Sequence, residues 1–400
     1  MRDLQNAVAS LDRAIELDPQ DHILFHMKGM ALRNQVYEMI QGSMPNPTKS
    51  DLERCLQTAT KAAAQFEIAR DLKPNEEHGY VSHIQMLLRI IEFARVVLGA
   101  QSGNQLVINP QLDQSLREST DVAEDLLEQA RKIREGEKAS SRVERCQVQL
   151  DSLYGNFEIV LQGWNNLLAR QDVYRPPIRR QLVYAYVARR GRRWDQLSVN
   201  EITRVVELLE QNILEEPNDR RNLRLWMQAV RRVQPPRSID QVIERVSYWK
   251  ANSPEIDAVY YLYVLYALKA LQGFSLATEL MSGNLEDCRK RTRLRPNRTG
   301  SFEWIGHRNG LPGLVHYSEL GGWDRDKDFW EKPENLQRLK GTIVAMSGPE
   351  AGTIELGAGV RVFFVPGKSG HARGRDENRA VEFYLGFSYD GPRAWEVKSV

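Results

Sequence analysis

Cysteine is scarce in this chain of 400 residues, and long hydrophobic runs are absent. The three cysteines, Cys55, Cys146 and Cys288, lie far apart and form no CxxC pair, which excludes a disulfide framework and a zinc-ligand set of the usual spacing. No stretch approaches the ~18 uncharged apolar residues of a membrane-spanning helix. The first twenty residues alternate charged and apolar residues instead of forming a secretory leader. We therefore expect reduced cysteines in the core, a cytoplasmic location and no membrane partner.

Motifs for catalysis and cofactor binding are also missing. The segment PGKSG (residues 366–370) resembles the end of a phosphate-binding loop, but the glycine required five positions before Gly367 is replaced by Val362. His22 and His26 stand one helical turn apart, a spacing that can hold a metal, yet no third ligand follows in the order of a zinc-protease motif, so we interpret them as an ordinary histidine pair. The sequence contains no GxSxG segment. It therefore predicts a chain that is not an enzyme and that uses no cofactor and no metal.

Most of the chain has the pattern of helices joined at prolines. Apolar residues recur at helical spacing on both sides of each joint, and proline costs little in the first turn of a helix. The joints resemble those of tetratricopeptide repeats, although only the last interval of 37 residues approaches the ~34-residue period of that repeat. We expect a TPR-like helical-repeat domain over residues 1–298, interrupted by Gly/Ser/Asn/Pro-rich loops at 41–50 and 99–111. The joints are Pro19, Pro74, Pro217 and Pro254.

Three further patterns predict helices within this region. Ser198 with Glu201, and Ser238 with Gln241, form capping boxes that mark helix starts. The tyrosine- and leucine-rich run at residues 260–271 follows a proline joint and predicts a buried core helix.

The last hundred residues change to the pattern of a β-domain. Residues 378–400 alternate apolar and polar residues and contain the turn sequence Asp-Gly-Pro at 390–392, which predicts a hairpin. With three preceding strands this gives five short strands around glycine-rich turns, which resembles the OB-fold barrels of cold-shock and ribosomal S1 proteins. We expect a β-domain over 299–400 with an OB-fold core at about 339–400, packed on the helices around Leu271 to Leu285. The three preceding strands are predicted at residues 341–346, 353–356 and 360–365.

The complete arrangement resembles a known family. The segments SFEWIGHRNGLPGLVHYSELG (301–321), GTIELGAGVRVFFVPG (352–367) and VEFYLGFSYDGPRAWEV (381–397), after a helical array, are similar to the C-terminal half of the sterile alpha motif domain-containing protein nine family and its prokaryotic relatives. These are large STAND-type P-loop NTPases of antiviral defence. The resemblance implies effector and NTPase regions upstream, followed by TPR-like repeats and a terminal OB-fold, so we expect this chain to be part of a longer protein. It supplies no functional residues, because the NTPase and effector motifs have no counterpart here.

Positive charge is concentrated in the middle of the chain, where residues 141–298 carry 26 Lys and Arg against 18 Asp and Glu. Arginine clusters of this kind suit phosphate contacts, and a neighbouring aromatic ring can stack on an unpaired base. The alternative interpretation of both clusters is a solvated linker and an exposed helix end. The candidate nucleic-acid-binding residues are Arg289, Lys290, Arg291, Arg293, Arg295 and Arg298, then Arg189, Arg190, Arg192, Arg193 and Trp194, with Arg361, Phe363 and Phe364 as weaker candidates on the barrel.

These observations favour a non-catalytic sensor or regulatory module. We expect it to bind a protein trigger or to restrain the upstream NTPase, so that its partner is a protein or an upstream region of the same polypeptide. Nucleic-acid binding through the arginine-rich helical region or the OB-fold is the alternative.

Overall fold

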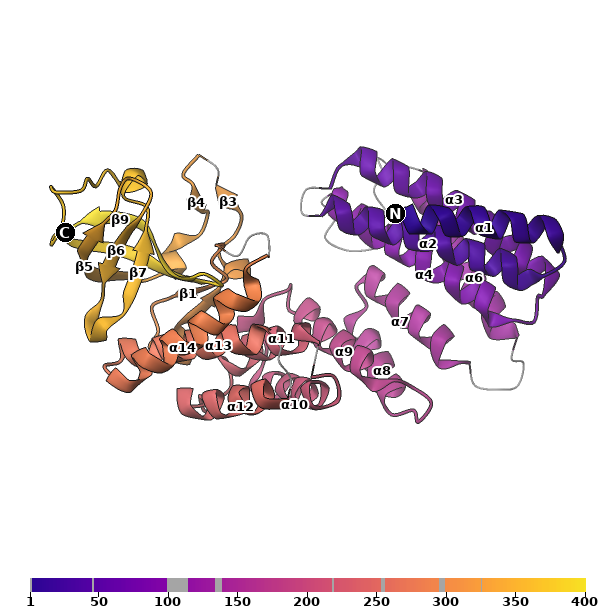
Figure 1. Cartoon of the computed structure of the whole chain (residues 1–400). Helices are drawn as coiled ribbons and strands as arrows, with labels where there is room; N and C mark the ends of the chain where they lie inside the picture. Colours follow the sequence, from indigo (N-terminus) through magenta and orange to yellow (C-terminus); the bar gives the residue numbers. More distant parts are fainter. Residues whose placement is uncertain are drawn as a thin grey trace. The chain divides into compact units, whose positions relative to one another are not determined.

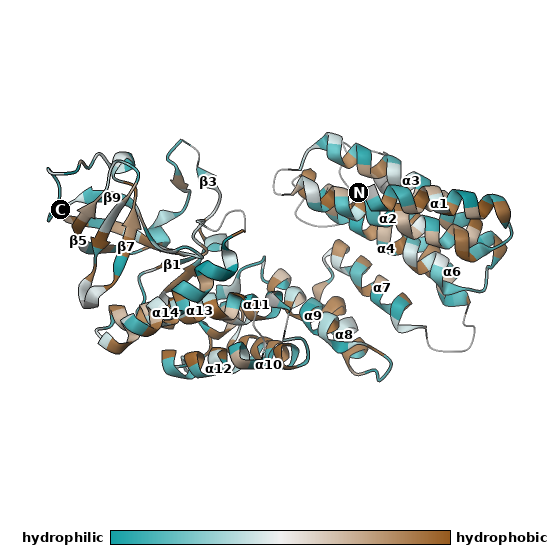
Figure 2. Cartoon of the chain, viewed as in Figure 1, coloured by the Kyte–Doolittle hydropathy of each residue, from teal (hydrophilic) through white to brown (hydrophobic). Residues whose placement is uncertain are grey.

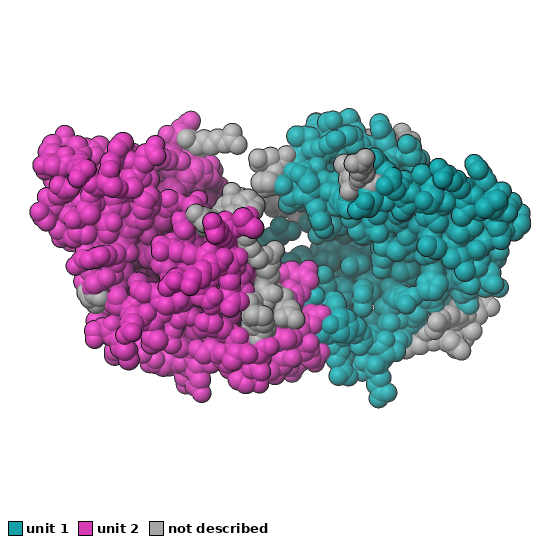
Figure 3. Space-filling view, viewed as in Figure 1, with its two compact units in different colours: residues 1–192 teal, residues 193–400 magenta. Residues whose placement is uncertain are grey.

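The computed structural model describes residues 2–44, 47–98, 114–133, 139–217, 219–252, 256–294, 299–324 and 326–400. These residues group into two compact units, residues 1–192 and residues 193–400, which are coloured separately in Figure 3. Among the described helices, none has the length and apolar character needed to span a lipid bilayer.

The first unit is built from helices that pack against their neighbours in the sequence (Figure 1). One of them, α4, contacts α2, α3, α6 and α7 and is therefore enclosed by helices on several sides. The helices of this unit are α1 (Arg2–Leu17), α2 (His22–Ser43), α3 (Lys49–Leu72), α4 (Glu77–Val97), α6 (Gln114–Lys132), α7 (Ser141–Tyr154), α8 (Phe157–Leu168) and α9 (Arg175–Arg189).

The core of the first unit is apolar. Phe66, Ile84 and Ile90 are completely buried, and each such side chain contributes roughly 1.5–3 kcal/mol through its removal from water. Cys55 and Cys146 belong to the same core, and all three cysteines of the chain are free and buried. The interpretation of the cysteines as core residues is therefore confirmed.

The predicted proline joints agree with the helix boundaries where the structure describes them. Pro19, Pro74 and Pro217 each lie between two helices. Pro254 and the predicted loop at 99–111 lie outside the described residues.

The predicted loop at 41–50 is shorter in the structure. α2 continues to Ser43, and α3 begins at Lys49 after the N-cap Thr48, whose hydroxyl accepts a hydrogen bond from the Asp51 backbone N–H at 3.2 Å. This cap satisfies one of the unpaired donors at the helix start, so fewer residues remain for the loop.

The second unit begins with a series of helices of its own. The capping boxes at Ser198 and Ser238 are both formed, and helices begin at the next residues, Val199 and Ile239. The predicted buried helix at 260–271 is also present, and it is apolar along almost its whole length. The helices are η1 (Trp194–Gln196), α10 (Val199–Glu215), α11 (Arg220–Val230), α12 (Ile239–Asn252), α13 (Ile256–Leu271) and α14 (Ser275–Thr292).

Five strands then close into a barrel. They pair in the order β5-β6-β7-β9-β8, and β8 returns to pair with β5. The β7–β9 pair is parallel, whereas the other four pairs are antiparallel. The five predicted strands are thus confirmed as a β-barrel that follows a helical array. The strands are β5 (Arg338–Met346), β6 (Gly352–Glu355), β7 (Arg361–Phe364), β8 (Ala380–Ser388) and β9 (Gly391–Ser399).

The alternation in β8 sets which side chains fill the barrel. Val381, Phe383 and Leu385 are buried inside, whereas Glu382 and Tyr384 point outward. The predicted hairpin is formed by β8 and β9. Figure 2 colours the chain by residue hydropathy and shows helices that carry both hydrophobic and hydrophilic residues. A shift of one residue would reverse the two faces, so this pattern fixes the register.

Four short strands precede the barrel. β1 (Glu303–Ile305) pairs with the second half of β8 and with β2 (Leu314–His316), which extends the barrel sheet. β3 (Trp323–Asp324) and β4 (Phe329–Trp330) form a separate hairpin.

The division into two units differs in position from the predicted change of domain after residue 298. The change from helix to strand does fall there, since α14 ends at Thr292 and β1 begins at Glu303. The compact units, however, divide between residues 192 and 193, so α10 to α14 and the β-domain form one unit. The contacts that join them provide the physical reason.

Candidate functional site

The β-domain is held on the preceding helices by buried polar side chains. We call this the helix–barrel contact and define it by eight residues. They are Arg224 of α11, Arg231 at the C-cap of α11, Asp257, Tyr260, Tyr261 and Tyr263 of α13, Glu303 of β1, and Tyr389 of the β8–β9 turn.

Three tyrosines of α13 reach the β-domain with their hydroxyl groups. Tyr260 donates to the backbone oxygen of Phe387 and Tyr263 to that of Ser388, both at 2.9 Å, while Tyr261 donates to Glu303 Oε1 at 3.2 Å. Burial raises the pKa of all three hydroxyls well above the usual value, so they remain protonated donors. Tyrosine suits this place because its ring packs in the core while its hydroxyl satisfies a buried acceptor.

An ion pair with almost no solvent exposure lies beside them. Arg231 donates to both carboxylate oxygens of Glu303 at 3.1 Å, and the two side chains are 2% and 0% exposed. Arg231 also donates to the backbone oxygens of Leu314 and Met227. A buried charge needs such complete pairing, because a partner left alone would keep its full desolvation cost.

A second buried carboxylate, that of Asp257, accepts hydrogen bonds from an arginine and from a tyrosine. Asp257, 1% exposed, accepts two hydrogen bonds from Arg224, at 2.8 and 3.1 Å. The Tyr389 hydroxyl accepts from Arg224 at 2.7 Å and donates to Asp257 at 2.7 Å. The turn between the last two strands is thereby fixed to α11 and α13.

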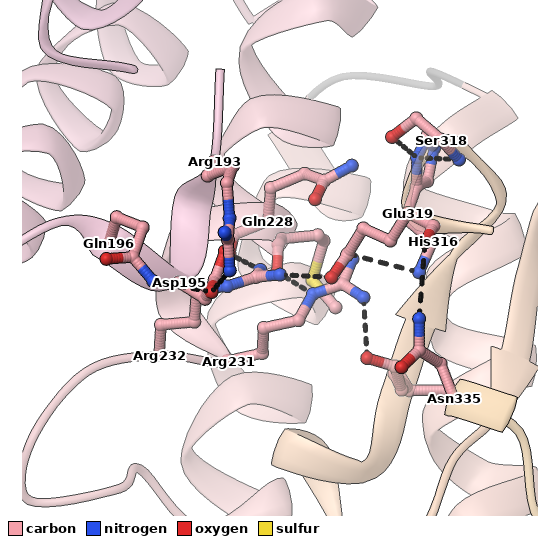
Figure 4. A network of polar contacts seen from close by, with 12 residues as sticks. Arg193, Asp195, Gln196, Gln228, Arg231, Arg232, His316, Ser318, Glu319 and Asn335 are labelled. Carbon is pink, nitrogen blue, oxygen red and sulfur yellow. Dashed lines mark hydrogen bonds and ion pairs between the residues drawn. The ribbon is translucent and has the colours of Figure 1, made fainter. Parts of the chain in front are cut away.

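The rim of the contact carries a further polar network, drawn in Figure 4. Arg232 donates to Glu319 Oε2 at 2.6 Å, and Glu319 Oε1 accepts from the backbone N–H of His316 at 3.3 Å. His316 Nδ1 accepts from the backbone N–H of Ser318. Burial, followed by the charge of Arg231, lowers the pKa of His316 to about 3, so this imidazole is neutral.

The polar groups of the helix–barrel contact bond to one another and have a structural role. Each of its carboxylates is paired with an arginine, and each hydroxyl has a partner. In the parts of the chain that the structure describes, no group of three or more His, Cys, Asp or Glu side chains could hold a metal ion. The segment PGKSG lies between β7 and β8, where its first four residues form the short 3-10 helix η6 (Pro366–Ser369) and no α-helix follows, and Lys368 within it pairs with Asp328. It therefore does not form a phosphate-binding loop.

Some cations of the predicted cluster at 289–298 bond to other residues of the second unit. Arg289 donates to the backbone oxygen of Asp390 at 2.8 Å, and Lys290 pairs with Glu286 at 2.8 Å. Gly391, next to Asp390, approaches Arg289 and Leu285 so closely that a side chain there would meet both. The predicted packing of the β-region near Leu285 is thus present, although most of the contact lies on α11 and α13.

The rest of that cluster is at the end of α14. Arg291 pairs with Asp287 at 2.8 Å, and Arg293 is exposed. Arg295 and Arg298 lie outside the described residues.

The second predicted cluster, residues 189–194, spans the division between the units. Arg189 pairs with Glu158 at 2.6 Å, and Arg190 and Arg192 are exposed. In the second unit, Arg193 donates to Asp195, and Trp194 is half-buried in η1 (Figure 4 labels Arg193).

The weaker candidates lie on β7. Arg361 is exposed and pairs with Glu355 at 3.5 Å. Phe363 is 36% exposed beneath the guanidinium of Arg393, which is 4.9 Å from the ring centroid, whereas Phe364 is 1% exposed. The prediction that at least one of the two phenylalanines belongs to the core is confirmed, and Phe364 is that residue.

Comparisons with known proteins assign no family. No family model and no curated protein matches the sequence. Among solved structures, the chain is similar to one described as the crystal structure of the APC/C hetero-tetramer Cut9-Hcn1, with 12% sequence identity and a TM-score of 0.26. The match covers 64% of this chain and 51% of that chain, so the chain spans about half of its length. A similarity of this size assigns neither fold nor function.

Proposed function

We propose that the chain is a non-catalytic interaction module of a larger regulatory protein. In it, a TPR-like helical array presents a binding surface for a protein partner, and an OB-type barrel forms a fixed end to the array. The strand order β5-β6-β7-β9-β8 and the single parallel pair support the OB-type assignment. The resemblance of residues 300–400 to antiviral STAND-type NTPases supports a role as a trigger-binding or restraining region of such a protein.

The observation that carries the proposal is that the β8–β9 turn is bonded to helices of the same unit. In an OB-type barrel, the loop between the last two strands is one of those that bind oligonucleotides. Here Tyr389 of that turn is bonded to Arg224 and Asp257, and Asp390 accepts from Arg289. The turn that would contact a nucleic acid is therefore occupied by the helices of the same unit.

The outer face of β6 and β7 also supports a structural role for the barrel. Stacking platforms for single strands need several exposed aromatic rings in a basic groove. On these strands Phe363 is the aromatic residue with substantial exposure, and the charge of Arg361 is offset by Glu355.

The test is affinity capture with the full chain, with and without nuclease treatment, followed by identification of both protein and nucleic acid. The proposal expects a stoichiometric protein partner that survives nuclease. It also expects that single-stranded RNA and DNA 20-mers bind no better than the ~10⁻⁴–10⁻⁶ M of non-specific contacts at physiological salt.

Two results would contradict the proposal. Nanomolar nucleic-acid binding that weakens steeply with salt and is lost in an Arg289→Glu, Arg291→Glu, Arg293→Glu variant would favour the nucleic-acid alternative. Magnesium-dependent ATP turnover that a point mutation in this chain abolishes would show that the chain is an enzyme.

A further inference from the structure

Aromatic side chains gather around the short β3–β4 hairpin of the β-domain. Trp304 of β1 and Phe329 of β4 are buried there, with ring centroids 5.7 Å apart, and both belong to one small apolar cluster. A hairpin with two residues in each strand has little stability of its own, so these contacts hold it on the sheet. Figure 1 shows the hairpin beside the barrel, within the same unit.

Four further rings around this cluster keep part of their area in solvent. We call them the aromatic surface, and they are Tyr317 of η3 (Tyr317–Glu319), Trp323 of β3, Trp330 of β4 and Trp395 of β9. Tyr317 and Trp323 are 39% and 38% exposed, and the other two are partly exposed. The Trp323 ring centroid lies 5.1 Å from that of Trp330 and 5.5 Å from that of Trp395, and Tyr317 lies 6.1 Å from Trp330. The rings therefore form one continuous surface in which each is fixed by a neighbour.

Two hydrogen-bond donors of the aromatic surface have no acceptor. Within the described part of the chain, the Tyr317 hydroxyl and the Trp323 indole N–H bond to no other residue, and both side chains are exposed. At a binding surface, tyrosine and tryptophan combine a large apolar ring with a donor of this kind. A matching ligand offers apolar groups and free carbonyl acceptors together.

The segment that carries three of the four rings is negatively charged. Residues 317–335 contain three Lys and Arg against six Asp and Glu, a net charge of 3 − 6 = −3. One carboxylate adjoins the exposed tryptophan, since Glu331 accepts from the backbone N–H of Gly322, the residue before Trp323, at 2.8 Å. A cation beside Trp323 would contact the ring face and pair with Glu331. A polyanion such as a nucleic acid would meet repulsion at the same place.

A proline-rich segment combines the groups that this surface requires. In the polyproline II conformation its rings are apolar, and its carbonyl oxygens have no internal hydrogen bonds and are free to accept. Surfaces lined by aromatic rings recognise such segments because the conformation is already formed, so little entropy is lost on binding. An amphipathic helix fits less well, because its carbonyl oxygens are already bonded within the helix and offer no acceptors for the two donors.

We propose that the aromatic surface binds a proline-rich segment of a partner protein, with an arginine or lysine of that segment placed against Trp323 and Glu331. The Tyr317 hydroxyl and the Trp323 N–H donate to carbonyl oxygens of the segment, and its proline rings pack on the aromatic rings. This site goes beyond the proposed function, which places a protein partner on the helical array, and it does not depend on that function.

The test is fluorescence anisotropy of labelled decapeptides titrated with the full chain. The first peptide is one arginine followed by nine prolines, and it should bind with a Kd below about 0.5 mM. The second, ten prolines, lacks the cation and should bind about 3-fold more weakly or worse. The third, one arginine followed by nine glycines, keeps the charge and the carbonyl groups but lacks the proline rings, and it should show no saturable binding.

Variants of the chain identify the site. Trp323→Ala should weaken binding of the first peptide at least about 10-fold, and Tyr317→Phe, which removes only a hydroxyl, about 2–10-fold. Glu331→Gln keeps an acceptor for the Gly322 N–H but removes the charge, so it should reduce the preference for the first peptide over the second. The matched control is Tyr248→Ala, which removes a 52% exposed ring from α12 and should leave binding unchanged.

The absence of saturable binding of the arginine–proline peptide to the unaltered chain would overturn the proposal. Equal binding of the glycine peptide, or an unchanged affinity in both Trp323→Ala and Tyr317→Phe, would overturn it as well. If Trp323→Ala does not fold, as judged by urea unfolding, Tyr317→Phe and Glu331→Gln still decide, because they change one hydroxyl and one charge. Binding of a single-stranded RNA 20-mer that these variants abolish, without binding of the proline peptides, would assign the surface to nucleic acid instead.

Discussion

Arginine donates to carboxylates in both units of this chain, but in the first unit two arginines donate to imidazole nitrogens instead. In the first unit, Arg70 and Arg142 donate to imidazole nitrogens. In the second unit, Arg231 donates to the carboxylate of Glu303. An imidazole loses its acceptor when a proton binds, whereas arginine and a carboxylate keep opposite charges through the physiological pH range.

This difference separates two kinds of sensitivity. The Arg70–His83 contact in the first unit is open to a change of pH, because burial and the charge of Arg70 lower the pKa of the acceptor imidazole below its value in the unfolded chain. The buried pair in the second unit is insensitive to moderate pH but sensitive to mutation, because removal of one partner leaves a charge without compensation in the core. The β-domain is thus held firmly on the helices while the first unit can respond to its surroundings.

The largest expected effect is on the helix–barrel contact. Glu303→Gln removes the negative partner of Arg231 and should lower the free energy of unfolding of the second unit by about 3–5 kcal/mol. Urea unfolding followed by tryptophan fluorescence measures it, since seven of the eight tryptophans lie in residues 193–400. As control, the double variant Arg231→Met with Glu303→Met should be less destabilised than the single variant. A loss below about 1 kcal/mol for Glu303→Gln would mean that the Arg231–Glu303 pair contributes little to the stability of the second unit.

Much of the fold of the second unit could be predicted from local patterns. The capping boxes, the alternation in 381–385 and the hairpin turn each depend on neighbouring residues, so the sequence alone shows them. The division between the units could not be predicted in this way, because it depends on contacts between residues such as Arg224 and Tyr389, which are 165 positions apart.

The nucleic-acid-binding candidates stay a prediction, and the helix–barrel contact was not predicted from the sequence. Charge counting selects Lys290 and Arg291, yet both pair with acids one turn earlier on α14. The helix–barrel contact was missed, although α13 contains a usable pattern: tyrosine at 260, 261 and 263 in a helix whose other residues are mostly apolar. A buried hydroxyl needs a partner, so repeated tyrosine in a core helix predicts polar contacts across it.

A smaller effect is expected from pH on the first unit. The folded state holds His83 neutral with a pKa of about 3, while the unfolded chain binds a proton below the ordinary value of about 6.5. Stability is therefore complete above about pH 6.5 and falls as the pH is lowered toward 3. Between pH 7 and pH 5 the loss is about 2 kcal/mol for this one group. Hydrogen exchange of the slowest-exchanging backbone amides of α4 measures this loss of stability. The His83→Asn variant should lose most of the dependence of stability on pH. The stability of the second unit, measured from its tryptophan-monitored unfolding, should change far less between pH 7 and pH 5. An equal change in both units would contradict the difference between them.

The smallest effect is expected where ion pairs lie on the surface. Arg291 and Asp287 are paired one turn apart on α14, with side chains 36% and 33% exposed. Solvent and salt screen such a pair, so Arg291→Ala should lower the free energy of unfolding by about 0.5 kcal/mol or less, and raising the salt from low to high concentration should reduce the difference further. The same urea titration that measures Glu303→Gln gives this value. The contrast matters because both pairs join an arginine to a carboxylate at similar distances, but the Arg231–Glu303 pair is buried and bonded through both carboxylate oxygens, whereas the Arg291–Asp287 pair is exposed. If Arg291→Ala cost as much as Glu303→Gln, exposure would not decide the strength of these pairs, and the surface arginines of α14 would have to hold the second unit together as the buried ones do.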